Sequence, residues 1–102
     1  MFRVLDFIIC TLAVMDKAAF NKLFGEFVRK KRLEQKLSQP QLSYKMGLDY
    51  QYISRVERGL ISPTLFWIYG LAKALDMSMI QFVSELSHYC RWEDSDTDTI
   101  FN

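Results

Sequence analysis

The side chains best suited to chemistry in this sequence lie on one face of a short predicted helix, residues 50–58. At 100° per residue, five polar side chains fall within about 140° of one another, namely Tyr50, Gln51, Ser54, Arg55 and Arg58. Glutamine can pair with adenine, and arginine with guanine, through two hydrogen bonds in the major groove of DNA. Residues near the start of such a helix reach deepest, which leaves Arg58 for a phosphate. The face therefore favours base recognition; a helix that is polar only for solubility is the alternative.

The opposite face of this helix is apolar and carries one carboxylate at its edge. Ile53 and Val56 point inward, with Glu57 beside them. In an earlier amphipathic helix, residues 18–36, the apolar side chains recur at i, i+3 and i+4, at Phe20, Leu23, Phe24, Phe27 and Val28. That face next reaches Arg32, and a charge on the core side is expensive unless it is paired. We therefore expect a buried ion pair between Arg32 and Glu57.

A second helix, residues 39–46, is predicted directly before the polar one. Ser38 and Gln41 match the capping-box pattern S-x-x-Q. Pro40 is tolerated in the first turn because an N–H group at that position has no intrahelical acceptor, so its absence removes no hydrogen bond. This helix is expected to bury two apolar side chains, Leu42 and Met46.

Glycines and capping residues divide the chain into five helices. Gly47 suits a left-handed helix terminus, and Asp49 can cap the next helix, which stops at Gly59. A fourth helix, residues 64–75, is expected to place one side toward the core, with Leu65, Ile68, Tyr69, Ala72 and Leu75. A fifth, capped by Ser78, carries on one face Met79, Phe82, Val83 and Leu86. The first fifteen residues could form a strand. The rest of the chain is predicted to consist of helices and loops.

The charge of the chain is unevenly distributed. Its 102 residues suit one domain, and because half of them are apolar, a core can form. Residues 17–59 contain ten Lys and Arg against four Asp and Glu, whereas residues 60–102 contain two against six. A basic middle indicates a surface that faces a polyanion, with a solvated charged face as the alternative.

Both ends of the chain differ from its middle. The apolar run of residues 7–15 is shorter than the roughly 20 residues that span a bilayer, so no membrane segment is predicted. The extension, residues 1–16, either packs against the domain or has an incidental role. The alternative is a strand or helix that pairs with another subunit. The tail, residues 93–102, is acidic and is expected to be flexible.

The remaining reactive residues do not form a catalytic or metal-binding pattern. Cys10 and Cys90 are far apart and lack metal-ligand spacing, so both are expected as reduced thiols in the cytoplasm. His88 has no nucleophile or ligand cluster near it in the sequence. We therefore expect no enzyme activity, no metal and no cofactor.

Three motifs, "LSQPQL", "MGLDYQYISRVERG" and "LAKALDMSMIQF", together resemble the helix-turn-helix domain of the Xre/Cro repressor family, which includes phage repressors and restriction–modification controller proteins. The resemblance runs from about residue 23 to residue 86, well over half of the chain. It implies an all-α, five-helix, lambda-repressor-like domain over residues 17–92.

The resemblance also implies roles for individual positions. Gln39, first in the second helix, matches a phosphate-binding glutamine, and Arg58 matches a phosphate contact after the polar helix. The base-facing positions correspond to Tyr50, Gln51, Ser54 and Arg55. Tyr52 matches a position that often touches the DNA backbone. Arg32 and Glu57 match a buried ion pair that fixes the geometry between helices. Ser43 departs from the usual alanine but is small enough to keep the helix crossing.

The function implied is a sequence-specific regulator of transcription that binds double-stranded DNA, most simply a dimeric repressor. Phe66, Trp67 and Tyr69 cannot all be buried on one side of a helix, so some are expected to meet a second subunit. The expected interface is the fifth helix with residues 1–16, in a homodimer that reads paired half-sites. Two alternatives remain, an antitoxin-like module that binds a protein partner and a regulator tethered to a membrane by residues 1–15.

Overall fold

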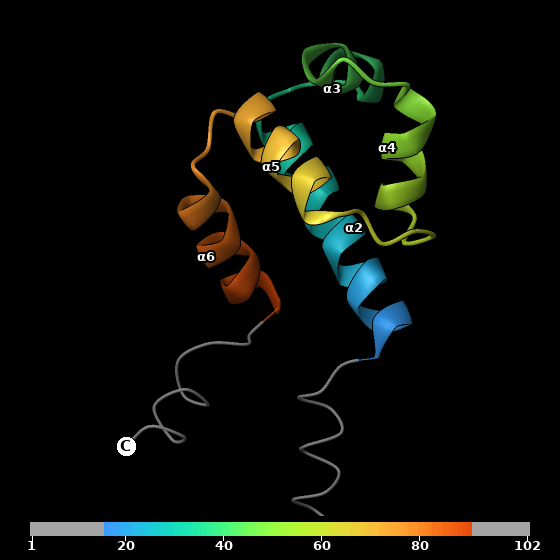
Figure 1. Cartoon of the computed structure of the whole chain (residues 1–102), viewed down its shortest axis with the longest axis vertical. Coiled ribbons are helices and arrows are strands. Elements are labelled where there is room, and N and C mark those ends of the chain that lie inside the picture. Colours follow the sequence, from blue (N-terminus) through green and yellow to red (C-terminus); the bar gives the residue numbers. More distant parts are fainter. Residues whose placement is uncertain (1–15, 91–102) are drawn as a thin grey trace, which may run out of the picture.

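The computed structural model describes residues 16–90, and these form helices and connecting loops only (Figure 1). In chain order the helices are α2 (Lys17–Glu34), α3 (Gln39–Met46), α4 (Tyr50–Glu57), α5 (Leu65–Ala74) and α6 (Met79–Cys90). The expected all-α class and helix order are confirmed. The predictions for residues 1–15 and for the tail lie outside the described residues. Between residues 16 and 90, no helix is both long and apolar enough to cross a membrane.

Every one of these helices begins with a side chain that accepts a hydrogen bond from its first turn. The accepting oxygens lie 2.8–3.2 Å from the main-chain nitrogens, and they belong to Asp16, Ser38, Asp49, Thr64 and Ser78. The capping box is complete, because Gln41 Oε1 also accepts from the Ser38 N–H at 2.7 Å. A helix of eight residues is not stable in water on its own. The caps, each worth about 1 kcal/mol, and tertiary packing therefore decide where α3 and α4 begin.

Each of the two helices of the helix-turn-helix unit, α3 and α4, is followed by a glycine. Gly47 (φ 71°) ends α3 in the left-handed conformation, and Gly59 (φ 77°) turns the chain after α4. Both values of φ are unfavourable for residues with a Cβ. The connection between α3 and α4 thus needs only Gly47, Leu48 and Asp49, which holds the two helices at a sharp angle (Figure 1).

The core lies where α2 and α6 meet and continues under α3, α4 and α5. Phe27 of α2 and Phe82 of α6 stand edge to face, with ring centroids 5.3 Å apart, a favoured aromatic geometry. Each of the shorter helices adds fully buried aliphatic side chains to this cluster, namely Leu42, Ile53, Val56 and Leu71. Met46, expected in the core, is only partly buried.

The expected inner face of α5 is partly wrong. Leu65 and Tyr69 are 70% and 50% exposed, whereas Trp67 is 9% exposed and packs in the core with Leu71. On α6, Val83 was also expected inside and is 44% exposed. Apolar residues surround most of α5, so periodicity could not choose its buried side. That side is set by the position of α5 between α3 and α6.

α2 closely approaches the last turn of α4. A Cβ on Gly25 would lie 2.3 Å from the carbonyl oxygen of Val56 and 2.7 Å from that of Glu57. Both neighbours are main-chain atoms, so neither can move aside as a side chain would. Gly25 thus sets how closely α2 crosses α4.

We predict that Gly25→Ala lowers the free energy of unfolding by about 1–3 kcal/mol or more, since it overpacks a backbone contact. The matched control is Gly70→Ala in α5, where a new Cβ would meet only Met46 Cε at 3.9 Å. That variant should gain roughly 0.5–1 kcal/mol from helix propensity. Urea unfolding followed by circular dichroism measures both, and equal stabilities for the two variants would contradict the assignment of Gly25.

Candidate nucleic-acid interface

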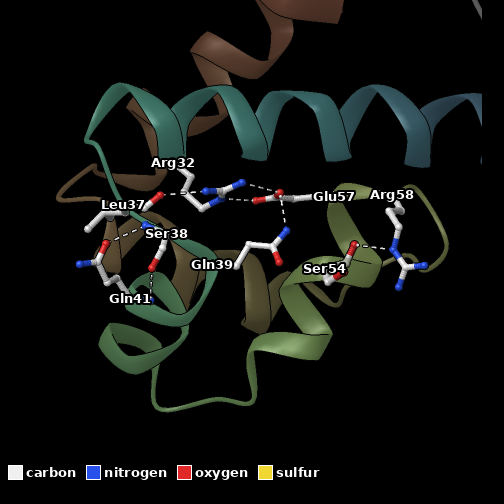
Figure 2. Close-up of polar contacts among 8 residues, drawn as sticks. All are labelled: Arg32, Leu37, Ser38, Gln39, Gln41, Ser54, Glu57 and Arg58. Atoms are coloured by element: carbon white, nitrogen blue, oxygen red, sulfur yellow. Dashed lines mark hydrogen bonds and ion pairs between the residues drawn. The ribbon is translucent and has the colours of Figure 1, made fainter.

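The expected ion pair between Arg32 and Glu57 is present and buried. Arg32 Nε lies 2.6 Å from Glu57 Oε2, and Arg32 Nη2 lies 2.9 Å from Glu57 Oε1. The two side chains are 8% and 3% exposed. Such a two-point contact fixes the angle as well as the distance between guanidinium and carboxylate. It therefore fixes α4 relative to α2 (Figure 2).

Two further hydrogen bonds extend the pair to the start of α3. Arg32 Nη1 donates to the carbonyl oxygen of Leu37 at 2.8 Å, and Gln39 Nε2 donates to Glu57 Oε1 at 2.9 Å. Figure 2 shows Arg32 of α2 and Gln39 of α3 both contacting Glu57 of α4. Because buried polar groups are costly when unsatisfied, this network holds α2, α3 and α4 in one arrangement.

Gln39 is therefore part of the ion-pair network, which sequence analysis did not foresee. Among its side-chain atoms only the amide N–H groups could donate to a phosphate, and one of them is directed at Glu57. Its main-chain N–H stands at the first position of α3, where a helix leaves donors unsatisfied. The phosphate role expected for Gln39 stays a prediction, and the main-chain N–H is the donor best placed for it.

The outer face of α4 gathers the expected base-facing residues. They line one hollow of about 280 Å³ together with Arg58, and these residues are Tyr50, Gln51, Ser54 and Arg55. Beneath them Ile53 and Val56 are fully buried. Arg58 follows α4 as its C-cap, and its Nε donates to the carbonyl of Ser54 at 3.4 Å (Figure 2). The polar face thus belongs to a helix whose opposite side is buried in the core.

Tyr52 is placed differently from these residues. It is half-buried, and its ring packs against that of Trp67, with centroids 5.1 Å apart and a tilt of 44°. The indole N–H of Trp67 is buried and, among the described residues, has no hydrogen-bond acceptor. Tyr52 thus fixes α4 to α5, while its expected contact with the DNA backbone stays a prediction.

Ser43 fits a position where the family resemblance implied alanine. It is 4% exposed, and its hydroxyl donates to the carbonyl oxygen of Pro40 at 2.9 Å. The hydroxyl is therefore satisfied inside α3 and does not disturb the crossing with α4.

Residues 29–32 of α2 are all basic (RKKR), and two of these residues form ion pairs on the side of α6. Lys31 forms ion pairs with Glu34 and with Glu85 of α6, and Lys30 pairs with Glu34 at 3.3 Å. The hydrogen bond from Lys31, joined by one from Gln81, holds the pKa of Glu85 below its usual range. The cations on the α6 side of α2 are thus neutralised by carboxylates.

Comparison with known proteins agrees with this geometry. The family model described as helix-turn-helix matches residues 28–82. The uncharacterized HTH-type transcriptional regulator y4dJ of Sinorhizobium fredii is 36% identical over 64 residues, which cover 63% of this chain and 83% of that protein. A second regulator of that organism, y4dL, is 40% identical over 53 residues, and the match spans only 27% of its length.

Solved structures of restriction–modification controller proteins share the fold. C.AhdI from Aeromonas hydrophila is 40% identical, with a TM-score of 0.56 over 57% of this chain and 88% of its own. C.Esp1396I, solved as a tetramer in complex with its natural 35 base-pair operator, is 29% identical. Its TM-score is 0.67 over 71% of this chain and 95% of its own.

We predict that Arg32→Ala lowers the free energy of unfolding by about 3–5 kcal/mol, because Glu57 would remain buried without its cation. The double variant Arg32→Met/Glu57→Met removes both charges and should cost clearly less than the single change. Thermal and urea unfolding of the two variants test this. An unchanged melting temperature for Arg32→Ala would show that the pair does not hold the helices.

Proposed function

The chain belongs to the helix-turn-helix family, and on that premise we propose that it is a transcriptional regulator that binds specific sequences in double-stranded DNA, most simply as a dimeric repressor. One observation carries this proposal. Tyr50, Gln51 and Arg55 on the polar outer face of α4 are exposed, while its inner face is held by core packing and by the Arg32–Glu57 pair. These findings point to a DNA-binding regulator rather than to an enzyme, and we propose that it acts in the cytoplasm, beside the DNA.

In this proposal α4 enters the major groove of B-DNA, which is wide enough for one helix. Tyr50 and Gln51, in the first turn, reach deepest. Gln51 offers a donor and an acceptor to adenine, and Arg55 offers two donors to guanine. Ser54 lies between them and can donate to or accept from a base edge. Their common anchorage on a short, rigid helix gives these contacts the register that base discrimination needs.

Contacts to phosphates set the register of the domain on the duplex. Arg58, at the end of α4, is exposed and can reach the backbone at that end. At the start of α3, the main-chain N–H of Gln39 and the positive end of the helix dipole suit a phosphate. Tyr52 would add its hydroxyl to the backbone from the edge of the core.

A dimer would place two copies of α4 in successive major grooves. Helices α5 and α6 pack against each other. Both helices expose large apolar side chains, namely Leu65, Phe66, Tyr69, Ile80 and Val83. Phe66 is 82% exposed, whereas Trp67 beside it is buried. Because exposed apolar clusters mark interaction sites, we propose that α5 joins α6 in the subunit interface. The part that residues 1–16 would play in it lies outside the described residues.

We predict that Gln51→Ala and Arg55→Ala each weaken binding to the operator by about 1–3 kcal/mol and relax specificity at one base pair. The operator is first obtained by selection from a random duplex library and sequencing, where an inverted repeat should be enriched. Binding to scrambled duplexes is the control, because loss of a base contact leaves it nearly unchanged. An equal loss on every sequence would mean that these side chains touch only the backbone.

We predict that Phe66→Glu weakens dimerisation by about 30-fold or more, the loss of one interface hot spot. Tyr44→Glu is the matched control, since Tyr44 is 87% exposed but lies on α3, away from the proposed interface. Sedimentation velocity over a concentration series measures both. A wild-type protein that is monomeric at high micromolar concentration would overturn the dimer itself.

A further inference from the structure

We infer that Lys22 and Arg29, on the edge of α2 beside α4, form a second DNA-binding surface that holds backbone phosphates next to the groove entered by α4. This inference rests on the proposed function and deepens it. It adds contacts from a helix outside the helix-turn-helix unit, at residues that the sequence analysis did not single out. The ligand of this surface is the phosphodiester backbone of the duplex that α4 binds.

The placement of Lys22 follows from the loop after α4. A Cβ on Gly59 would lie 3.0 Å from the Cα and 3.2 Å from the N of Lys22, so the two backbones touch. The loop itself is fixed, since the Leu60 N–H donates to the Arg55 carbonyl at 3.0 Å. The backbone of Lys22 is therefore held against Gly59, the residue that follows Arg58, and Arg58 is proposed to bind a phosphate at the end of α4.

Arg29 lies on the same edge of α2, two turns further on. Seven residues at 1.5 Å each separate it from Lys22 by about 10 Å along the helix and by only about 20° around it. Between them is Gly25, whose contact with the carbonyls of Val56 and Glu57 marks the side of α2 that faces α4. Lys22 and Arg29 stand just outside this contact, and both are exposed.

The charges on α2 differ between its two sides. Lys30 and Lys31, toward α6, are paired with carboxylates, whereas no carboxylate within residues 16–90 pairs with Lys22 or Arg29. Glu26 stands at ion-pair spacing from both, four residues after one and three before the other. It instead accepts a hydrogen bond from the hydroxyl of Tyr89 at 3.3 Å. The two cations beside α4 are thus left available to an anion from outside.

The geometry of the groove supplies that anion. A helix with its side chains is about 10–12 Å wide and nearly fills a major groove of about 12 Å. An exposed element that flanks the end of that helix is therefore close enough to reach one of the phosphate strands that border the groove. Long, unpaired Lys and Arg side chains on the exposed edge of α2 are suited to this strand. Such contacts would strengthen binding to any sequence alike.

The test is the salt dependence of DNA binding by Lys22→Ala and Arg29→Ala. Each phosphate contact contributes about 0.9 to the slope of log K against log salt, so each change should lower the slope by roughly 2 for a dimer on two half-sites. Affinity for the selected operator and for scrambled duplexes should fall by the same factor. Fluorescence anisotropy between about 50 and 200 mM KCl covers the range in which the effect is large.

Lys30→Ala is the matched control, because it removes the same charge from the same helix on the side that faces α6. Lys22→Arg keeps the charge and should keep the slope. Slopes for Lys22→Ala and Arg29→Ala that equal that of Lys30→Ala would overturn the inference, since only the overall charge would then matter. A wild-type protein that binds no duplex at any salt concentration would instead overturn the proposed function.

Discussion

The arrangement of this domain depends on one buried ion pair, that of Arg32 with Glu57. Two charges taken out of water stabilise a fold little by themselves, since desolvation offsets their attraction. What they impose is geometry, because neither group tolerates the loss of its partner. Here the carboxylate also accepts from Gln39, and the guanidinium also donates to the carbonyl of Leu37. Three helices therefore have one low-energy arrangement, and α4 cannot rotate without leaving a buried charge unsatisfied.

This constraint makes a helix of eight residues usable for recognition. α4 is too short to be stable alone, and base discrimination needs side chains held within about half an ångström of their productive positions. Several contacts on the inner side of the helix supply this rigidity. Ile53 and Val56 are fully buried beneath it, Tyr52 packs on Trp67, and Gly25 lets α2 contact its last turn. The exposed polar face is what remains after these contacts are made.

The surface is divided in a way that separates two kinds of contact. The outer face of α4 is polar or cationic, and the exposed cations of α2 on that side, Lys22 and Arg29, have no carboxylate partner within residues 16–90. α5 and α6 expose several large apolar side chains, and the cations of α2 that face α6 are neutralised by Glu34 and Glu85. One surface therefore suits a polyanion and the other suits a protein. A dimeric regulator needs both surfaces on each subunit.

From the sequence alone, the helices and the caps Ser38, Asp49 and Ser78 could be predicted, because each rests on local spacing. The ion pair could be predicted because Arg32 and Glu57 each lie at the inner side of an otherwise apolar face, so that each charge needs a partner. The polar face of α4 followed from the same periodicity. The buried side of α5 could not be predicted, since its apolar residues surround the helix and only its neighbours α3 and α6 select Trp67 over Tyr69. The engagement of Gln39 with Glu57, and the position of Lys22 beside Gly59, join residues 18 and 37 positions apart. Such contacts have no local signal, and only the tertiary structure decided them.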